Sequence, residues 1–193
     1  MTFNKTFLYI YRIIHNLNEN CEYDYPGEFP QKPQAVIIVP TRNLTLQIRA
    51  NVRKFTSRHG HSVKTVVVYG GLCTKEGCVC SSVGFQLSNL FKGCNILIAT
   101  PGRLLHFVEN GKVTFENVKF LVLDEADKML DLGFLPNITK IACHSTMPPK
   151  GERRTLMFSK TFPDAVQQMA LDFLQDYLSF TMDGSHEWIR AGW

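Results

Sequence analysis

The sequence predicts an α/β fold with a mostly parallel sheet, and three observations carry that prediction. Short apolar runs alternate along the chain with amphipathic stretches, the pattern of strands joined by crossover helices. Runs such as Val36–Val39 are apolar at every position, as expected for strands covered on both faces. The run Phe120–Leu123 ends in the carboxylates Asp124, Glu125 and Asp127. Since ligands of open α/β sheets bind at the carboxyl ends of strands, this cluster is the first candidate site.

The elements follow in order from these patterns. Strands are expected where short apolar runs are bounded by turn residues, and helices where apolar side chains recur at helical spacing, as Val166, Met169 and Phe173 do. The expected strands are Ala35–Val39, Thr65–Tyr69, Asn95–Ala99, Lys119–Leu123, Thr155–Phe158 and Tyr177–Met182. The expected helices are Lys5–Leu17, Leu44–Ser57, Phe85–Phe91, Arg103–Glu109, Lys128–Gly133 and Asp164–Leu174. The expected surface loops are Asn18–Pro33, Gly70–Gly84 and His144–Glu152.

Length and composition fit one globular domain. The 193 residues are 45% hydrophobic and 20% charged, enough for one full core. We expect the domain to occupy residues 1–183 and an unstructured tail to occupy 184–193, where no periodicity is visible. A net charge of +4 permits a nucleic-acid partner without requiring one. No apolar run reaches the roughly 18 residues that cross a bilayer, so a soluble intracellular protein without a membrane partner is expected.

The six cysteines are expected to be free thiols. Cys73, Cys78 and Cys80 are the closest group, with the spacing C-x4-C-x-C. This spacing lacks the paired C-x2-C of a zinc site, so thiols in a surface loop are the preferred interpretation.

The acidic cluster and three turns are expected to share one edge of the sheet. The turns are Pro40-Thr41-Arg42, Gly70-Gly71 and Thr100-Pro101-Gly102-Arg103, each directly after an expected strand. Their amides, hydroxyls and arginines are groups that bind phosphates without reading bases. The acids could hold magnesium and orient a water against a nucleotide phosphate, or could simply lie at a solvated helix N-terminus.

These motifs also carry a family resemblance. Asp124-Glu125-Ala126-Asp127, taken with Pro40-Thr41-Arg42, Thr100-Pro101-Gly102-Arg103 and Ser159-Lys160-Thr161 in that order, resembles the first RecA-like domain of DEAD-box RNA helicases. The flanking residues are most similar to the Vasa-like branch, as in Arg154–Ser159. The resemblance covers about residues 4 to 180 and implies a three-layer RecA-like fold.

The resemblance implies a role for each motif residue. Asp124 would hold Mg²⁺ through water, Glu125 would orient and deprotonate the attacking water, and Asp127 would link the nucleotide site to Ser159 and Thr161. The implied cofactors are ATP and Mg²⁺, and the implied partners are RNA and a second RecA-like domain. A cytoplasmic location is implied as well, with germ-line ribonucleoprotein granules as an extension of it. The positions implied to contact the RNA backbone are Pro40, Thr41, Arg42, Gly70, Gly71, Thr100, Pro101, Gly102 and Arg103.

The sequence departs from the family pattern at the phosphate loop. No G-x4-G-K-S/T run occurs, and the nearest candidate is Asn4-Lys5-Thr6, which makes Lys5 and Thr6 the expected nucleotide contacts. We therefore expect the strand that feeds this loop, and the second domain, to lie outside these residues. Lys160 replaces a family alanine and is expected either to pair with Asp124 or Asp127 or to point to solvent.

Two functions remain open on the sequence alone. The first is a fragment of an ATP-dependent, Vasa-like RNA helicase, in which hydrolysis is coupled to RNA binding and local duplex unwinding. The second is a catalytically inactive, truncated or degenerate relative that binds only RNA or a partner protein. The motifs favour the first function. The departure from the phosphate-loop pattern favours the second, and it predicts that the chain alone does not turn over ATP.

Overall fold

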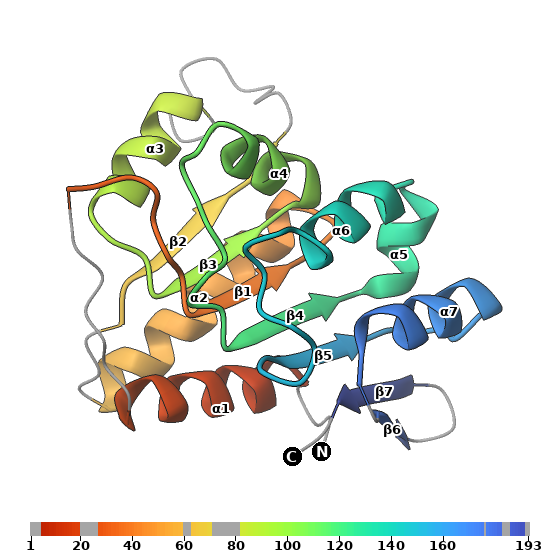
Figure 1. Ribbon diagram of the computed structural model, residues 1–193. Coiled ribbons are helices and arrows are strands. Elements are labelled where there is room, and N and C mark those ends of the chain that lie inside the picture. Colours follow the sequence, from red (N-terminus) through yellow and green to blue (C-terminus); the bar gives the residue numbers. More distant parts are fainter. Residues whose placement is uncertain are drawn as a thin grey trace.

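The computed structural model describes residues 5–19, 27–59, 63–70, 82–175, 177–182 and 186–191. A seven-stranded sheet lies between two layers of helices (Figure 1). The strands are β1 (Ala35–Ile38), β2 (Thr65–Val68), β3 (Ile96–Ala99), β4 (Phe120–Asp124), β5 (Arg154–Phe158), β6 (Tyr177–Met182) and β7 (His186–Ala191). The helices are α1 (Lys5–Glu19), α2 (Arg42–His59), α3 (Val83–Phe91), α4 (Pro101–Glu109), α5 (Ala126–Asp131), α6 (Leu135–Ala142) and α7 (Asp164–Phe173).

The sheet has the order β2-β3-β1-β4-β5-β7-β6, and its first five strands are parallel. The register is continuous across it, with Ala35 opposite both Ile96 and Phe120. The predicted α/β class with a mostly parallel sheet is therefore confirmed. Because the five parallel strands share one direction, their carboxyl ends form a single edge, which we call the rim.

Alternating side chains of the central strands feed two hydrophobic layers. Val36, Leu97 and Leu121 point to the larger layer, which packs beneath α3 to α7. Ile37, Ile98 and Val122 point to the other, which packs beneath α1 and α2. All six of these side chains are buried, which explains the continuous apolar runs read from the sequence.

Four helices begin two residues earlier than predicted. α2 begins at Arg42, α3 at Val83, α4 at Pro101 and α5 at Ala126, so parts of two expected turns are first helical turns instead. Proline suits the first helical position because its ring fixes a helical φ. Proline also lacks an N–H, and an N–H at this position would have no acceptor within the helix. Helix α6 was not predicted, although Ile138, Ile141 and Ala142 form its buried face.

The expected unstructured tail is corrected by the structure. Residues His186–Ala191 form β7, which pairs antiparallel with both β5 and β6. This strand escaped the sequence pattern because its residues do not alternate between apolar and polar side chains and because its pairing with β5 is non-local, although β6 and β7 form a short hairpin. Within the described ranges, no helix is both long and apolar enough to cross a membrane.

Candidate nucleotide and RNA site

The rim brings together most of the predicted site residues. Asp124 is the last residue of β4, and Ser159 directly follows β5 beside it. Arg42 and Arg103 lie in the first turns of α2 and α4, which follow β1 and β3. Gly71 lies outside the described residues. The other predicted residues fall into two groups, one at β4 and β5 and one at β1, β2 and β3.

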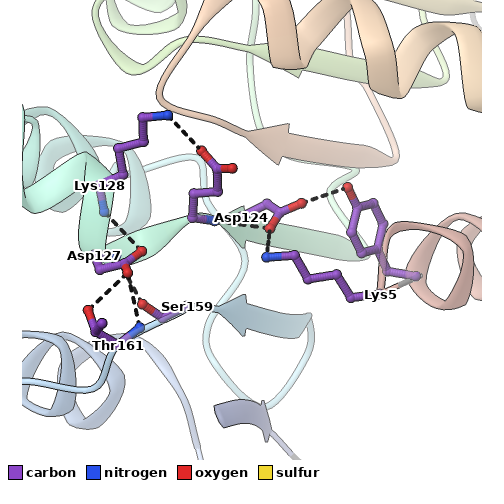
Figure 2. Close-up of polar contacts among 8 residues, drawn as sticks. Lys5, Asp124, Asp127, Lys128, Ser159 and Thr161 are labelled. Carbon is purple, nitrogen blue, oxygen red and sulfur yellow. Dashed lines mark hydrogen bonds and ion pairs between the residues drawn. The ribbon is translucent and has the colours of Figure 1, made fainter. Parts of the chain in front are cut away.

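The first group is centred on a buried carboxylate. Asp124 is 1% exposed, and its Oδ1 lies 3.0 Å from the Nζ of Lys5, as Figure 2 shows. The Tyr9 hydroxyl donates a hydrogen bond to Asp124 Oδ2 at 3.1 Å, and the Glu125 amide donates to Oδ1 at 3.0 Å. Lys5 is thus placed at the acid cluster, and Thr6 lies half-buried beside it in the first turn of α1.

Tyr9 is a site residue that sequence reasoning missed. Its ring is buried and lies 5.3 Å from the ring of Phe158 on β5, centroid to centroid. Burial, followed by the negative charge of Asp124, raises the pKa of the Tyr9 hydroxyl well above its ordinary value. The hydroxyl therefore stays protonated and remains a donor to the carboxylate. Tyrosine in an amphipathic helix reads as a packing residue, so only the fold reveals this contact.

Glu125 has an uncommon backbone conformation. Its φ of 57° and ψ of 54° are left-handed, and it forms the N-cap of α5. This conformation is sparsely populated by residues other than glycine, and it turns the chain sharply from strand to helix. The Glu125 carboxylate lies 3.4 Å from the Nζ of Lys128. The turn separates the Asp124 and Glu125 side chains, so the two acids occupy different environments.

Asp127 connects α5 to the segment after β5. Its Oδ2 accepts hydrogen bonds from the Thr161 amide at 3.0 Å and the Thr161 hydroxyl at 2.9 Å (Figure 2). Its own amide donates to Ser159 Oγ at 3.1 Å. Partial burial acts to raise the pKa of Asp127, but hydrogen bonds from Thr161, Lys128 and Ser159 outweigh it and hold that pKa below its ordinary value. The link predicted between Asp127, Ser159 and Thr161 is present as direct contacts.

Lys160 lies between the two hydroxyl residues but takes no part in this link. Its side chain is exposed, and among the described residues it forms no ion pair with Asp124 or Asp127. Of the two expectations for Lys160, the structure shows the solvent-facing one.

The donor chemistry at Asp124 fits Mg²⁺. Carboxylate oxygens are hard ligands, and Mg²⁺ commonly binds through one or two of them while keeping several waters and substrate oxygens. The Lys5 ammonium already places a positive charge against Asp124 Oδ1. No group of three His, Cys, Asp or Glu side chains gathers as metal ligands in the described part of the chain. Asp124 would therefore hold the ion with few other protein ligands. The three clustered cysteines that were considered for zinc, Cys73, Cys78 and Cys80, lie outside the described residues.

The second group joins the carboxyl ends of β1, β2 and β3. The Arg42 guanidinium stacks 5.0 Å from the centroid of the Tyr69 ring, and the Gly70 amide donates to Thr100 Oγ1 at 3.1 Å. Thr41 Oγ1 accepts from the Leu44 amide at 3.4 Å in the first turn of α2. Thr100 is buried, which leaves its hydroxyl to position Gly70. Two further predicted residues, Pro40 and Pro101, are buried, whereas Gly102 is exposed.

Gln86 on α3 completes this group and was not predicted. Its side-chain amide pairs with both backbone groups of Tyr69, accepting from the N–H at 3.1 Å and donating to the carbonyl at 3.0 Å. Its Oε1 also accepts from Arg103 Nη1 at 3.3 Å. Gln86 is buried, and a buried glutamine in an apolar helix is the signal that could have marked it.

Comparisons with known proteins place this rim in context. A family model described as "DEAD/DEAH box helicase" matches residues 5–169. The chain is 45% identical over 175 residues to a Penaeus vannamei protein described as "Probable ATP-dependent RNA helicase vasa-like", a match covering 90% of this chain and 23% of that protein. The chain therefore spans about a quarter of the length of this curated relative.

Two solved structures are similar over nearly the whole chain. The yeast DEAD-box splicing factor Prp28 matches with a TM-score of 0.73 at 31% identity, covering 91% of this chain and 38% of that one. Prp28 from Chaetomium thermophilum bound to ADP matches with a TM-score of 0.69 at 31% identity and the same coverage. The predicted RecA-like architecture agrees with these domain structures.

Proposed function

We propose that this chain, which belongs to the DEAD/DEAH box helicase family, carries the ATP-hydrolysing and RNA-binding rim of a Vasa-like RNA helicase. The observation that supports it best is the paired arrangement at β4 and β5. A buried Asp124 faces a cation, and Asp127 is bonded directly to the segment that contains Ser159 and Thr161. Family members use ATP, generally with Mg²⁺.

In this proposal the acidic residues divide the chemistry. Asp124 would hold Mg²⁺, and the ion would supply positive charge against the phosphates. Glu125 accepts a proton from the attacking water and orients it, from a carboxylate that the left-handed turn separates from Asp124. Lys5 and Thr6 contact the phosphates, and Lys5 exchanges its present contact with Asp124 for them.

The same proposal couples hydrolysis to RNA through Asp127. Because Asp127 contacts both hydroxyl residues after β5, a movement of α5 is transmitted to that segment. Arg42, Arg103, Gly70 and the neighbouring turn residues bind the RNA backbone, and the amides at the helix starts are well placed for phosphates. Such contacts suit an enzyme that acts on many sequences.

The remaining parts of the proposal concern partners and place. A second RecA-like domain would complete the site, consistent with the 38% of the yeast protein's chain that is covered. The proposed location is the cytoplasm, and this part of the proposal rests on the Vasa-like resemblance.

The test uses a chimera in which this chain replaces the matching part of the Penaeus vannamei relative. We expect RNA-stimulated phosphate release from the chimera, and a loss of about 10²–10⁴-fold in Glu125→Gln, because a positioned base contributes about that much. Glu116→Gln, at an exposed acid away from the rim, is the matched control and is expected to leave the rate unchanged.

The 193-residue chain is assayed beside the chimera. It contains no G-x4-G-K-S/T loop to cradle the phosphates, so we expect no RNA-stimulated turnover. Phosphate release by this chain that Glu125→Gln abolishes would contradict that expectation. A chimera that binds RNA but never hydrolyses ATP would favour the inactive, RNA-binding alternative.

A further inference from the structure

A hollow lies along the outer side of β2, the outermost strand at one end of the sheet, away from the rim's acidic group. It has a volume of about 360 Å³, and its floor is formed by residues 64–67, which are Lys64 and the first three residues of β2. Helix α2 contributes one wall through Leu46 and Arg49, and helix α3 contributes the other through Phe85 and Asn89. We call this hollow the β2 groove. Its volume falls within the usual range of ligand pockets.

The backbone of β2 presents unpaired groups to this groove. β2 is the outermost strand at its end of the sheet and pairs with β3 on its inner side. The carbonyls of Lys64 and Val68 accept from β3 and the residues beside it, so they point inward. Because peptide groups alternate in direction along a strand, those of Thr65 and Val67 point outward. No described residue bonds to them on that side.

Gln86 shows what an outer partner does at this edge. Its amide pairs with the N–H and the carbonyl of Tyr69, the next outward-facing residue, as an adjoining strand would. The ladder is therefore capped at Tyr69 and left open at Thr65 and Val67. An extended segment lying in the groove would continue the same pattern of hydrogen bonds.

The groove's charge indicates the chemistry of its occupant. The described lining residues include the cations Arg49, Lys64 and Lys92 and no carboxylate. Arg49 Nε is buried without a hydrogen-bond partner among the described residues, an arrangement that favours an incoming acceptor. Leu46 and Phe85 are 36% and 43% exposed, so the walls also offer apolar surface to side chains.

From these observations we infer that the β2 groove binds an extended acidic peptide segment of a protein partner, which adds a strand to β2 and places a carboxylate against Arg49. Strand addition supplies affinity through the Thr65 and Val67 peptide groups, and the charge supplies selectivity. A peptide is favoured over RNA because the floor offers a row of backbone groups at strand spacing.

The test uses a fluorescent peptide of alternating valine and threonine with one central glutamate, and a second peptide with lysine at that place. Fluorescence anisotropy on the 193-residue chain is expected to show binding of the glutamate peptide only. Arg49→Gln is expected to weaken this binding about tenfold or more, since a hydrogen bond to a charged group is lost. Arg53→Gln, at an exposed arginine one turn further along α2, is the matched control and should not change it.

A second measurement tests the strand pairing without relying on one variant. Bound peptide should slow hydrogen exchange at the Thr65 and Val67 amides. Val67→Pro should abolish binding while the β2–β3 ladder persists, because proline is tolerated where an edge N–H faces outward. Equal binding of both peptides, or unchanged exchange at Thr65 and Val67, would overturn the inference. So would displacement of the peptide by RNA, or self-association of the chain through this edge.

Discussion

At the scale of single residues, Asp124 shows how the fold supports a buried charge. Removing a carboxylate from water is costly unless it is paired and hydrogen-bonded. Here the ammonium of Lys5, the hydroxyl of Tyr9 and the amide of Glu125 supply those partners. The carboxylate is therefore held in one orientation by groups from two distant parts of the chain.

Replacing Tyr9 with phenylalanine tests this support. The Tyr9→Phe variant keeps the ring against Phe158 but removes one donor from a buried acceptor, so we expect the free energy of unfolding to fall by about 1–3 kcal/mol. Urea unfolding followed by circular dichroism measures it. Tyr11→Phe, on the exposed side of α1, is the control and should unfold like the parent chain. Equal stability of Tyr9→Phe and the parent would show that the hydroxyl adds nothing.

The pKa of Asp127 gives a pH-dependent prediction. Because its folded-state pKa lies below its unfolded-state value, its contribution to stability is present above the unfolded-state pKa and is lost as the pH falls through the folded-state pKa. Thr161→Val removes a hydroxyl donor and should raise the pKa of Asp127 toward its ordinary value. A carbon-13 NMR titration of the side-chain carboxyl measures the change. Thr139→Val, at an exposed hydroxyl on α6, should leave the Asp127 pKa where it is.

At the scale of elements, sequence patterns within a short stretch predicted those helices and strands whose burial such a pattern records. The central strands are buried on both faces, so their apolar runs located each of them to within a residue or two. The early starts of α2 and α4 were missed because Arg42 and Pro101 occupy first helical turns without an apolar pattern. β7 was missed because its pairing with β5 depends on residues about thirty positions earlier in the chain.

The residues of the candidate site also divide into those that the local sequence predicted and those that it did not. The acids and arginines were predicted because their motifs are contiguous in sequence. Tyr9 and Gln86 were not, because each belongs to a helix whose pattern reads as packing and acts on a residue of another element. Such contacts are fixed by the crossing of helix and strand, which no short stretch of sequence records.

Gln86 supplies the prediction at this scale. Gln86→Leu preserves the side-chain bulk but removes the hydrogen bonds that the Gln86 amide makes with the N–H and the carbonyl of Tyr69. We expect the free energy of unfolding to fall by about 1–3 kcal/mol and hydrogen exchange at the Tyr69 amide to accelerate. Gln47→Leu, at an exposed position on α2, is the control for adding an apolar side chain. Unchanged exchange at Tyr69 would contradict the assigned role.

At the scale of the whole molecule, the rim depends on the entire parallel sheet. The ends of β1, β2 and β3 carry the predicted RNA contacts, the end of β4 carries the acids, and the end of β5 carries the hydroxyl residues that contact Asp127. Since β1 and β4 are neighbours in the sheet, the two groups meet along one edge although their sequences are far apart. The sheet's strand order, more than any single loop, sets the distance between the two chemistries.

RNA binding tests this arrangement. If the arginines contact phosphates, affinity for single-stranded RNA should fall steeply with salt and vary little with sequence. Arg42→Gln and Arg103→Gln should each reduce the slope of log affinity against log salt by about 0.7. Arg12→Gln, at an exposed arginine on α1, is the control. Fluorescence anisotropy over a salt series measures the slopes, and salt-independent, sequence-selective binding would contradict the proposal.

The contact between Lys5 and Asp124 shows that the thermal stability of this domain and the integrity of its site are separate properties. Replacing a buried ion pair by well-packed apolar residues is often neutral or stabilising. A variant of this chain with apolar residues at Lys5, Tyr9 and Asp124 leaves no buried Tyr9 hydroxyl without its acceptor, so we expect it to keep or raise its melting temperature although it has lost the carboxylate proposed to hold Mg²⁺. Thermal stability is therefore a poor surrogate for an intact site, and screens of this domain for stability alone would reward the loss of its chemistry.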